Sequence, residues 1–396
     1  MDRSQLAWIG LACLALVAAG CLGSEEPIEE AADAASEANA SEDWARPLPE
    51  DVTGLEPLAH VENVEAGAGL DLHGDHAYVS GQNSGFHVVD VSTPEDPQVL
   101  GNITGRYTRD VDLVFQDNRT IAVLATNGDG MLFADVTDPR TPEIVGEALT
   151  DALVHNVGQV PGTDIVYSAR STGDQVVDIV DVSDPANPEV VDTREQLACH
   201  DVSFGPEAET AYCPAHAETQ IWDITDPLDP QIVSRIHNPS MQIQHWATVT
   251  EDGETLIIGD EFAGSTDAAA GCLAGVDTPG LERTTSDPVG AIWFYDVSDP
   301  TTPVPISWVA PPVPADNTPP APCTAHFGEI LPGQDKIVVG WRAAGSVLVD
   351  FADVRNPEIL DDALPVGDNW ETRYHNGYLF SGDTERGLDV VVPTGD

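Results

Sequence analysis

The 396-residue sequence predicts an all-β fold. Four short runs rich in β-branched and aromatic residues recur along the chain, separated by Gly, Pro and Asp, and none has helical periodicity. An eight-residue motif that begins with Asp and ends with Pro follows the third run of each unit. Four strands repeated every 40 to 45 residues or so are typical of a β-propeller. The motif begins at Asp90, Asp135, Asp181, Asp223, Asp296 and, in degenerate form, Asp350, and a truncated copy contains Asp389.

These seven aspartates predict a seven-bladed β-propeller of four-stranded blades over residues 55–396. The last blade lacks an outer strand after Val392, and a strand-like run at Pro57–Val64 precedes the first blade. We expect this run to complete the last blade, because pairing the two chain ends removes an unpaired strand edge. We interpret the motif aspartates as turn formers that accept backbone N–H bonds two residues on, and not as calcium ligands.

The strand that carries the motif resembles a known repeat. Val177–Val182, followed by Ser-Asp-Pro-Ala-Asn-Pro, is similar to the LVIVD repeat of bacterial and archaeal surface propellers. The resemblance covers residues 55–396 and implies a propeller fold and a cell-surface location. It implies no reaction, because that family is largely without an assigned biochemistry.

The N-terminal segment predicts export and lipid anchoring. Residues 1–20 contain the apolar stretch Leu6–Ala19 and resemble a lipoprotein signal peptide that ends in small residues before Cys21. Cys21 would carry the lipid, although Ala18 stands where leucine is usual, and plain secretion is the alternative. Residues 21–54 are acidic and form a predicted flexible stalk. We therefore expect an extracytoplasmic protein anchored to the cytoplasmic membrane.

The formal net charge of −53 excludes nucleic acid as a partner and indicates a medium of high salt concentration. With 68 Asp and Glu against 15 Lys and Arg, the chain has no basic stripe for nucleic acid. Negative charges at this density repel one another and destabilise the folded state in dilute salt. Near 1 M salt the Debye length falls to about 3 Å, so this repulsion is largely screened. The composition favours adaptation to high salt, with an ordinary acidic secreted protein as the alternative.

Four histidines recur in register with the blades. His155, His200 and His245 are 45 residues apart, and His326 takes the same position after an insertion. Because the first strand of each blade lines the axis, we expect four imidazoles at one height, where they could bind zinc, copper or iron. The alternative is a consensus residue that bonds the neighbouring blade, and the other seven histidines fall outside this register.

A second register lies at the end of each second strand, on the same face. Glu261 in this register could complete the metal shell. The two insertions, 263–290 and 310–323, open on this face as well, which favours it as the binding face. The candidate ligand-binding residues are Arg109, which precedes the histidines in the first register, and Arg170, Arg342 and Asp383 in the second.

Four of the six cysteines lie in the body of the protein. Cys199 and Cys213 belong to the first two strands of one blade, whereas Cys272 and Cys323 lie in the two insertions. We favour the pairing within each of these two sets, one of three possible pairings. Thiolate metal ligation is the alternative, although the chain has no Cys-x-x-Cys.

The motifs of familiar enzymes are absent, since the sequence has no Gly-x-Ser-x-Gly, no phosphate-binding glycine loop and no His-Glu-x-x-His. We assign no catalytic residue. The sequence predicts a binding or interaction module whose partner is an envelope protein or a small ligand. The alternative is a metal-dependent enzyme, an oxidoreductase, that uses the histidine cluster.

Overall fold

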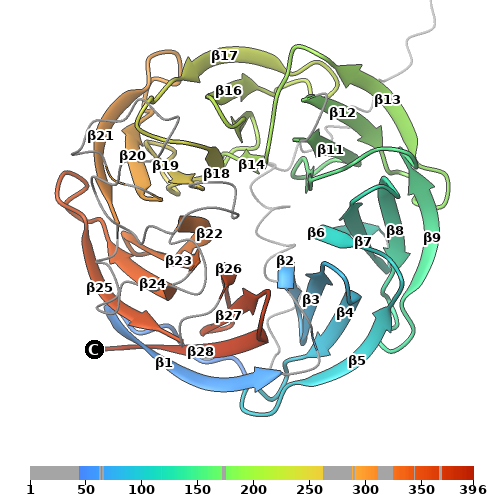
Figure 1. Ribbon diagram of the computed structural model, residues 1–396, viewed down its shortest axis with the longest axis horizontal. Helices are drawn as coiled ribbons and strands as arrows, with labels where there is room; N and C mark the ends of the chain where they lie inside the picture. The colour runs from blue at the N-terminus through green and yellow to red at the C-terminus, as the bar shows by residue number, and fades with distance from the viewer. Residues whose placement is uncertain are drawn as a thin grey trace, which may run out of the picture. The chain divides into compact units, whose positions relative to one another are not determined.

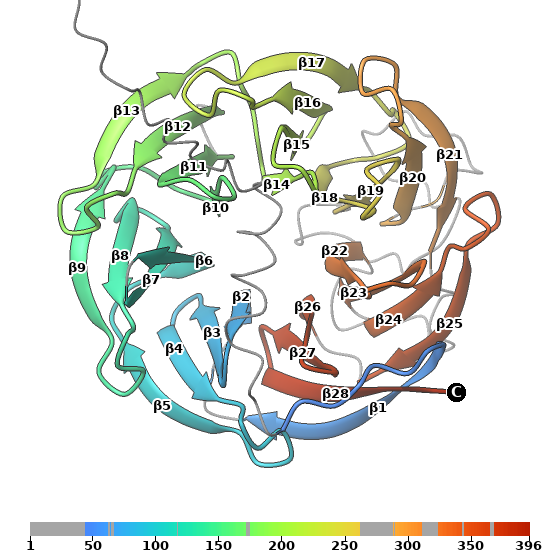
Figure 2. The same ribbon diagram turned by 180° about the vertical axis from the view of Figure 1, so that it is seen from behind.

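The computed structural model describes residues 44–61, 64, 67–116, 118–171, 175–261, 288, 290–310, 324–342, 344–364 and 368–396. These residues form strands and turns, and four-stranded antiparallel sheets stand around a common axis (Figures 1 and 2). The all-β propeller architecture that the repeat predicts is confirmed. Within the described ranges, no helix has the length and hydropathy needed to cross a bilayer.

In each of the five four-stranded sheets the strands follow one another from the axis outward in chain order. The first sheets contain β2 (Gly67–His73), β3 (His76–Gly81), β4 (Gly85–Asp90) and β5 (Gln98–Ile103); β6 (Thr108–Gln116), β7 (Arg119–Thr126), β8 (Met131–Asp135) and β9 (Glu143–Ala148); and β10 (Asn156–Gln159), β11 (Ile165–Arg170), β12 (Val176–Asp181) and β13 (Glu189–Arg194). They are followed by β14 (Ser203–Phe204), β15 (Thr210–Pro214), β16 (Thr219–Asp223) and β17 (Gln231–Ile236); and by β18 (Gln244–Val249), β19 (Thr255–Asp260), β20 (Ile292–Asp296) and β21 (Val304–Val309).

The remaining strands form one sheet of eight. It contains β22 (Thr324–Ile330), β23 (Lys336–Arg342), β24 (Gly345–Asp350), β25 (Glu358–Ala363), β26 (Asn369–His375), β27 (Tyr378–Asp383), β28 (Gly387–Gly395) and β1 (Val52–Val61). A single parallel pairing, between Phe327 and Glu371, joins its two four-stranded halves. The N-terminal strand β1 pairs antiparallel with the C-terminal strand β28, from Val52 opposite Gly395 to Val61 opposite Leu388.

The repeated aspartates form the turns that follow the third strand of each unit. The Oδ1 atom of Asp90 accepts the backbone N–H of Ser92 at 3.0 Å, and that of Asp181 accepts the N–H of Ser183 at 2.9 Å. Asp135, Asp223, Asp296 and Asp350 make the same bond. The interpretation of these residues as turn formers is confirmed.

Neighbouring sheets pack face to face through apolar side chains. One cluster joins Phe294 of β20 to Trp341 of β23, and another joins Ile179 of β12 to Trp222 of β16. These side chains are fully buried, which stabilises each by roughly 1.5–3 kcal/mol relative to exposure. The core is therefore divided between blades.

Polar side chains link the innermost strands of adjacent sheets. The axis side of an innermost strand has no neighbouring strand, so its N–H groups need other acceptors. Asp110 Oδ2 accepts the N–H of Val157 at 3.0 Å, and Glu371 Oε2 accepts that of Leu70 at 2.8 Å. Asn156 Oδ1 accepts the N–H of Val202 at 3.0 Å. These acid and amide side chains at the axis therefore have a structural role, because they accept backbone hydrogen bonds from the neighbouring blade.

Candidate metal centre at the axis

Irregular pairing near the start of four innermost strands places one residue of each strand at the axis. The pairing register skips Arg109 in β6, His245 in β18 and Trp370 in β26, and it skips a segment containing His326 in β22. A β-bulge of this kind leaves its extra residue unpaired and redirects the side chain. Regular strand alternation would not place these side chains together.

In two further sheets, a histidine reaches the same position at the axis without a bulge. His155 and His200 lie just before the first strand of their sheets, and their backbone N–H groups donate to Ala169 O at 2.8 Å and Pro214 O at 2.6 Å. These bonds hold both residues against the second strand. We call the resulting set the axial row; it consists of Arg109, His155, His200, His245, His326 and Trp370.

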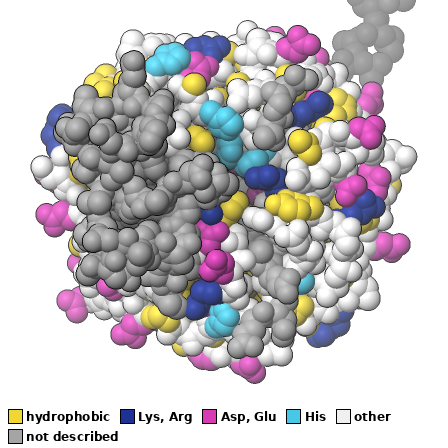
Figure 3. Space-filling view, viewed as in Figure 1, with side chains coloured by type: hydrophobic (Ala, Val, Ile, Leu, Met, Phe, Trp, Pro, Cys, Tyr) yellow, Lys and Arg dark blue, Asp and Glu magenta, His cyan; other side chains and the backbone are white. Residues whose placement is uncertain are grey.

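The structure brings the four predicted histidines side by side. Ring centroids are 3.8 Å apart for His155 and His200, 4.2 Å for His200 and His245, and 4.2 Å for His245 and His326. Figure 3 shows histidine side chains gathered near the centre of this face. The expectation of imidazoles at one height around the axis therefore agrees with the geometry, whereas metal binding by them stays a prediction.

Two buried carboxylates lie against the histidines. His200 Nδ1 donates to Asp201 Oδ2 at 2.6 Å, and the same oxygen is 3.5 Å from His245 Nδ1. On the other side, His245 Nε2 is 3.5 Å from Glu261 Oε2, and His326 Nε2 is 4.0 Å from Glu261 Oε1. The predicted residue Glu261 therefore does reach the cluster, from the end of β19.

Asp201 was not predicted, and its orientation differs from that of its equivalents. Three other residues also directly follow a member of the axial row: Asp110, Asn156 and Glu371. Each of them accepts a backbone N–H from a neighbouring blade. The carboxylate of Asp201 instead faces the histidines, and its Oδ1 atom is buried without a hydrogen-bond partner. No pattern in the sequence indicates this difference, because the acids at the equivalent positions are structural.

Three buried atoms of this cluster have no hydrogen-bond partner. His155 Nδ1 and His245 Nδ1 join Asp201 Oδ1 among the described buried atoms that have no hydrogen-bond partner. Each such atom costs about 1–3 kcal/mol when left unsatisfied. An unsatisfied carboxylate oxygen among imidazoles is the arrangement that a bound cation would satisfy.

Burial sets the protonation of the cluster. It lowers the pKa of His200 to about 4 and lowers the pKa of His155, His245 and His326 well below the usual value, so these imidazoles are neutral at pH 7. Burial also raises the pKa of Asp201 and of Glu261. Neutral imidazole is the form that coordinates a metal, and a cation would favour the ionised carboxylates.

Two overlapping donor groups result. Ligand atoms of His200, His245 and Glu261 lie within 4.8 Å of one another, as do those of His155, His200 and Asp201. In the first group the Nδ1 atom of His200 is engaged by Asp201, so its Nε2 atom remains for coordination. His326 Nδ1 donates to Trp370 O at 2.9 Å, which likewise leaves Nε2, beside Glu261. This donor set fits zinc, copper or iron.

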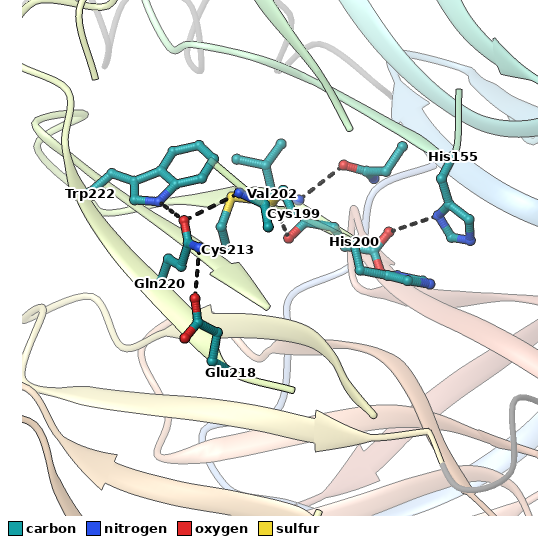
Figure 4. The surroundings of a disulfide bond; sticks show 11 residues. His155, Cys199, His200, Val202, Cys213, Glu218, Gln220 and Trp222 are labelled. Carbon is teal, nitrogen blue, oxygen red and sulfur yellow. Dashed lines mark hydrogen bonds and ion pairs between the residues drawn. A yellow bond between two sulfur atoms is a disulfide. The ribbon is translucent and has the colours of Figure 1, made fainter. Parts of the chain in front are cut away.

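A disulfide holds the segment that carries His200 and Asp201. The strand β14 has only two residues, so strand pairing does little to fix residues 197–202. Cys199 and Cys213 are bonded, as predicted, and Figure 4 shows the bond between Gln220 and Trp222 on one side and His200 on the other. Gln220 Oε1 also accepts the backbone N–H of Ala198 at 3.3 Å. The predicted partners Cys272 and Cys323 lie outside the described residues.

The predicted ligand-binding residues of the second register are engaged internally. Arg170 forms two bonds with Asp178, at 2.6 and 2.7 Å, and Asp383 accepts the backbone N–H of Glu385 and of Arg386. Their role in ligand binding stays a prediction. Most of both insertions, 263–290 and 310–323, lies outside the described residues.

Arg342 lies at the His326 end of the axial row. It donates twice to Asp368 and once to Glu261, at 3.3 Å, and stacks over Trp370 with its guanidinium carbon 5.0 Å from the ring centroid. Trp370 is the member of the axial row in the last blade. Its spacing from His326 in the sequence could therefore have predicted its place beside the cluster. Two further residues lie beside the cluster without being members of the histidine register. They are Asp368 and His216, whose ring centroid is 4.9 Å from that of His200.

Comparisons with known proteins agree with the fold. The LVIVD repeat family model matches residues 68–104 and 172–193. No curated protein matches the chain. The structure of U3-55K is similar with a TM-score of 0.60 at 12% identity, covering 88% of this chain and 100% of that one. The crystal structure of RRP9 WD40 repeats is similar with a TM-score of 0.59 at 10% identity, covering 87% and 99%. Identities this low show the fold alone. The chain is thus a β-propeller protein in which two segments match the LVIVD repeat.

Proposed function

We propose that the protein is a β-propeller binding module whose ligand at the axis is a transition-metal ion. The observation that carries this proposal is the convergence of His200, His245 and Glu261, with His200 oriented by Asp201. Metal-ligating histidines commonly donate their second ring N–H to a carboxylate or a backbone carbonyl, which fixes the tautomer. His200 donates to Asp201 and His326 donates to Trp370 O, so both follow this rule.

The contacts of the histidines differ from one another. A consensus residue with a purely structural role would repeat one contact in every blade. Here His155 accepts from Arg109, His200 donates to Asp201, and His326 donates to a carbonyl. This diversity supports a site that is assembled once, with each histidine in its own position.

We place the ion at His200, His245 and Glu261, with His326 as the fourth ligand. Zinc, copper and iron all accept imidazole and carboxylate donors. Copper or iron would make the centre redox-active, which is the basis of the second candidate function, a metal-dependent oxidoreductase. The identity of the bound ion separates this candidate from a binding module.

Metal titration of the full chain tests the proposal. We expect about one equivalent of a transition metal after reconstitution, and an affinity at least about 100-fold lower in His245→Ala. His237→Ala is the matched control, since His237 is 66% exposed and lies outside the cluster. The proposal is overturned if elemental analysis finds only trace metal, or if His245→Ala binds as tightly as the wild type.

We also propose that the ring has seven blades and is closed by β1, and that Cys21 anchors it outside the cytoplasmic membrane in a salty medium. The pairing of β1 with β28 supports closure, and the buried disulfide is consistent with an oxidising compartment. Cys21→Ser should shift the protein from the detergent phase to the aqueous phase in Triton X-114 partitioning. Unchanged partitioning would contradict the anchor.

A further inference from the structure

Three segments of the chain have the pattern Asn-x-Ser or Asn-x-Thr without proline in the middle. This pattern is the acceptor motif for N-linked glycans in exported proteins. The motifs begin at Asn39, Asn102 and Asn118. Asn39 lies outside the described residues, and none of the three asparagines belongs to the proposed metal site.

Asn102 lies on the perimeter of the propeller. It belongs to β5, the outermost strand of its sheet, and among the described residues the outer edge of β5 has no neighbouring strand (Figure 1). Both Asn102 and Thr104 are exposed. The next residue, Gly105, has a positive φ of 79°, and the chain bends there. The amide and the hydroxyl that define this motif can therefore be reached from solvent in the folded protein.

The motif at Asn118 is less accessible. Asn118 is exposed in the turn between β6 and β7, but Thr120 is half-buried. The backbone N–H of Thr120 donates to Thr137 Oγ1 at 3.1 Å, and the carbonyl of Thr120 accepts the N–H of Val136 at 2.9 Å. A glycosyltransferase must bind the asparagine and the hydroxyl residue together, so these contacts oppose modification of the folded chain at Asn118.

We propose that Asn102 carries an N-linked glycan and is preferred to Asn118 as the acceptor; this rests on the proposed location outside the cytoplasmic membrane. The donor class is a glycan attached through phosphate to a membrane lipid. The Nδ2 atom of Asn102 forms a bond to the anomeric carbon of the glycan, and the bond from that carbon to the phosphate oxygen breaks. The lipid phosphate leaves with the electron pair of the broken bond, and one amide proton is released to solvent.

The position of Asn102 separates the glycan from the axial row. β5 lies at the perimeter of the first sheet, whereas the four histidines lie at the axis in later sheets (Figures 1 and 2). A glycan is bulky and hydrophilic, so at this position it would solvate the rim of the propeller. We therefore expect Asn102→Gln to bind transition metals as tightly as the wild type, which keeps the glycan and the metal site separately testable.

Glycopeptide mass spectrometry of the full chain, purified from the organism that produces it, tests the proposal. We expect a glycan on Asn102 in most copies and a lower occupancy at Asn118. The glycan should be lost in Thr104→Ala and retained in Thr104→Ser, because serine keeps the hydroxyl that the motif requires. Asn238 is the internal control, since proline follows it in Asn238-Pro-Ser and its Nδ2 atom donates to Tyr295 OH at 2.8 Å. It should stay unmodified.

The mass of the mature N-terminus separates the possible failures. An unmodified Asn102 in a chain that has lost residues 1–20 would overturn the glycan and leave the proposed location intact. An equal or higher occupancy at Asn118 would overturn the preference for Asn102. An uncleaved, unmodified chain in the cytoplasm would overturn the proposed location, and the glycan with it.

Discussion

His200 Nδ1 donates a 2.6 Å hydrogen bond to Asp201 Oδ2, although the two residues are adjacent in the chain. The remaining oxygen of Asp201 is buried without a hydrogen-bond partner, 3.7 Å from His155 Nδ1, while acids and amides at equivalent positions accept backbone N–H groups. In the structure, Asp201 thus orients the histidines instead of linking the strands. This relationship makes Asp201 the most informative residue to change.

Asp201→Asn should weaken transition-metal binding about 10–100-fold, because the tautomer and orientation of His200 would no longer be fixed. A chelator-competition titration of the full chain measures this change. Asp110→Asn is the matched control, since Asp110 is in the corresponding position but accepts from Asn156 and Val157. Equal metal affinity in Asp201→Asn and the wild type would contradict the orienting role.

Removing the disulfide should affect stability and the metal site together. Cys199 and Cys213 are 14 residues apart, and a bridge over a loop of this length contributes about 3 kcal/mol. The double variant Cys199→Ser, Cys213→Ser should therefore unfold at lower denaturant concentration and bind metal more weakly. Denaturant titration and metal titration give the two values. A less stable protein with unchanged metal affinity would show that residues 197–202 are held without the bond.

The axial acid Asp112 should make stability depend on pH. Burial raises its pKa to about 7, and it faces Asp71 of β2 and Arg373 of β26 across a cavity of about 290 Å³. Since an unfolded Asp has a pKa near 3.9, the stability contribution of this group is fully present below about pH 4 and is lost as the pH rises through 7. Asp112→Asn should thus gain stability relative to the wild type between these values and show a constant difference above.

Denaturant unfolding at fixed salt, across this pH range, measures the difference between Asp112→Asn and the wild type. Asp184→Asn provides the contrast, because the hydrogen bond from Asn187 lowers the pKa of that exposed carboxyl. Its stability contribution has the opposite sign with pH, being present above about pH 4 and lost below. A difference for Asp112→Asn that does not vary with pH would contradict the assignment.

Removing β1 should expose the edge of β28. A chain that begins after Val61 leaves β28 without its partner, and an unpaired edge strand promotes association. We expect lower thermal stability and oligomers in size-exclusion chromatography with light scattering. A chain that begins at Trp44 keeps β1 and is the control. A stable monomer without β1 would mean that the β1–β28 pairing is dispensable.

The sequence alone determined the architecture, because repetition multiplies a weak signal. A single Asp-x-x-Asp-Pro turn predicts little, but recurrent copies with four strand-like runs between them specify a propeller. The same repetition predicted the histidine register, because the four histidines take equivalent positions in successive units. The bond between Cys199 and Cys213 was predicted from their places in the first two strand-like runs of one unit.

Only the tertiary structure decided what breaks the repeat. Three features have no periodic signal: the bulges that redirect Arg109 and His245, the orientation of Asp201 toward His200, and the contrast between Arg342, which pairs with two carboxylates, and Arg109, which donates to a histidine. The bulges depend on how two strands of one sheet pair, and the carboxylate of Asp201 lies among histidines that neighbouring sheets bring to the axis, so none of these features exists before the sheets form and assemble. Spacing in the chain shows which residues are equivalent, whereas the chemistry of the centre depends on how those residues differ.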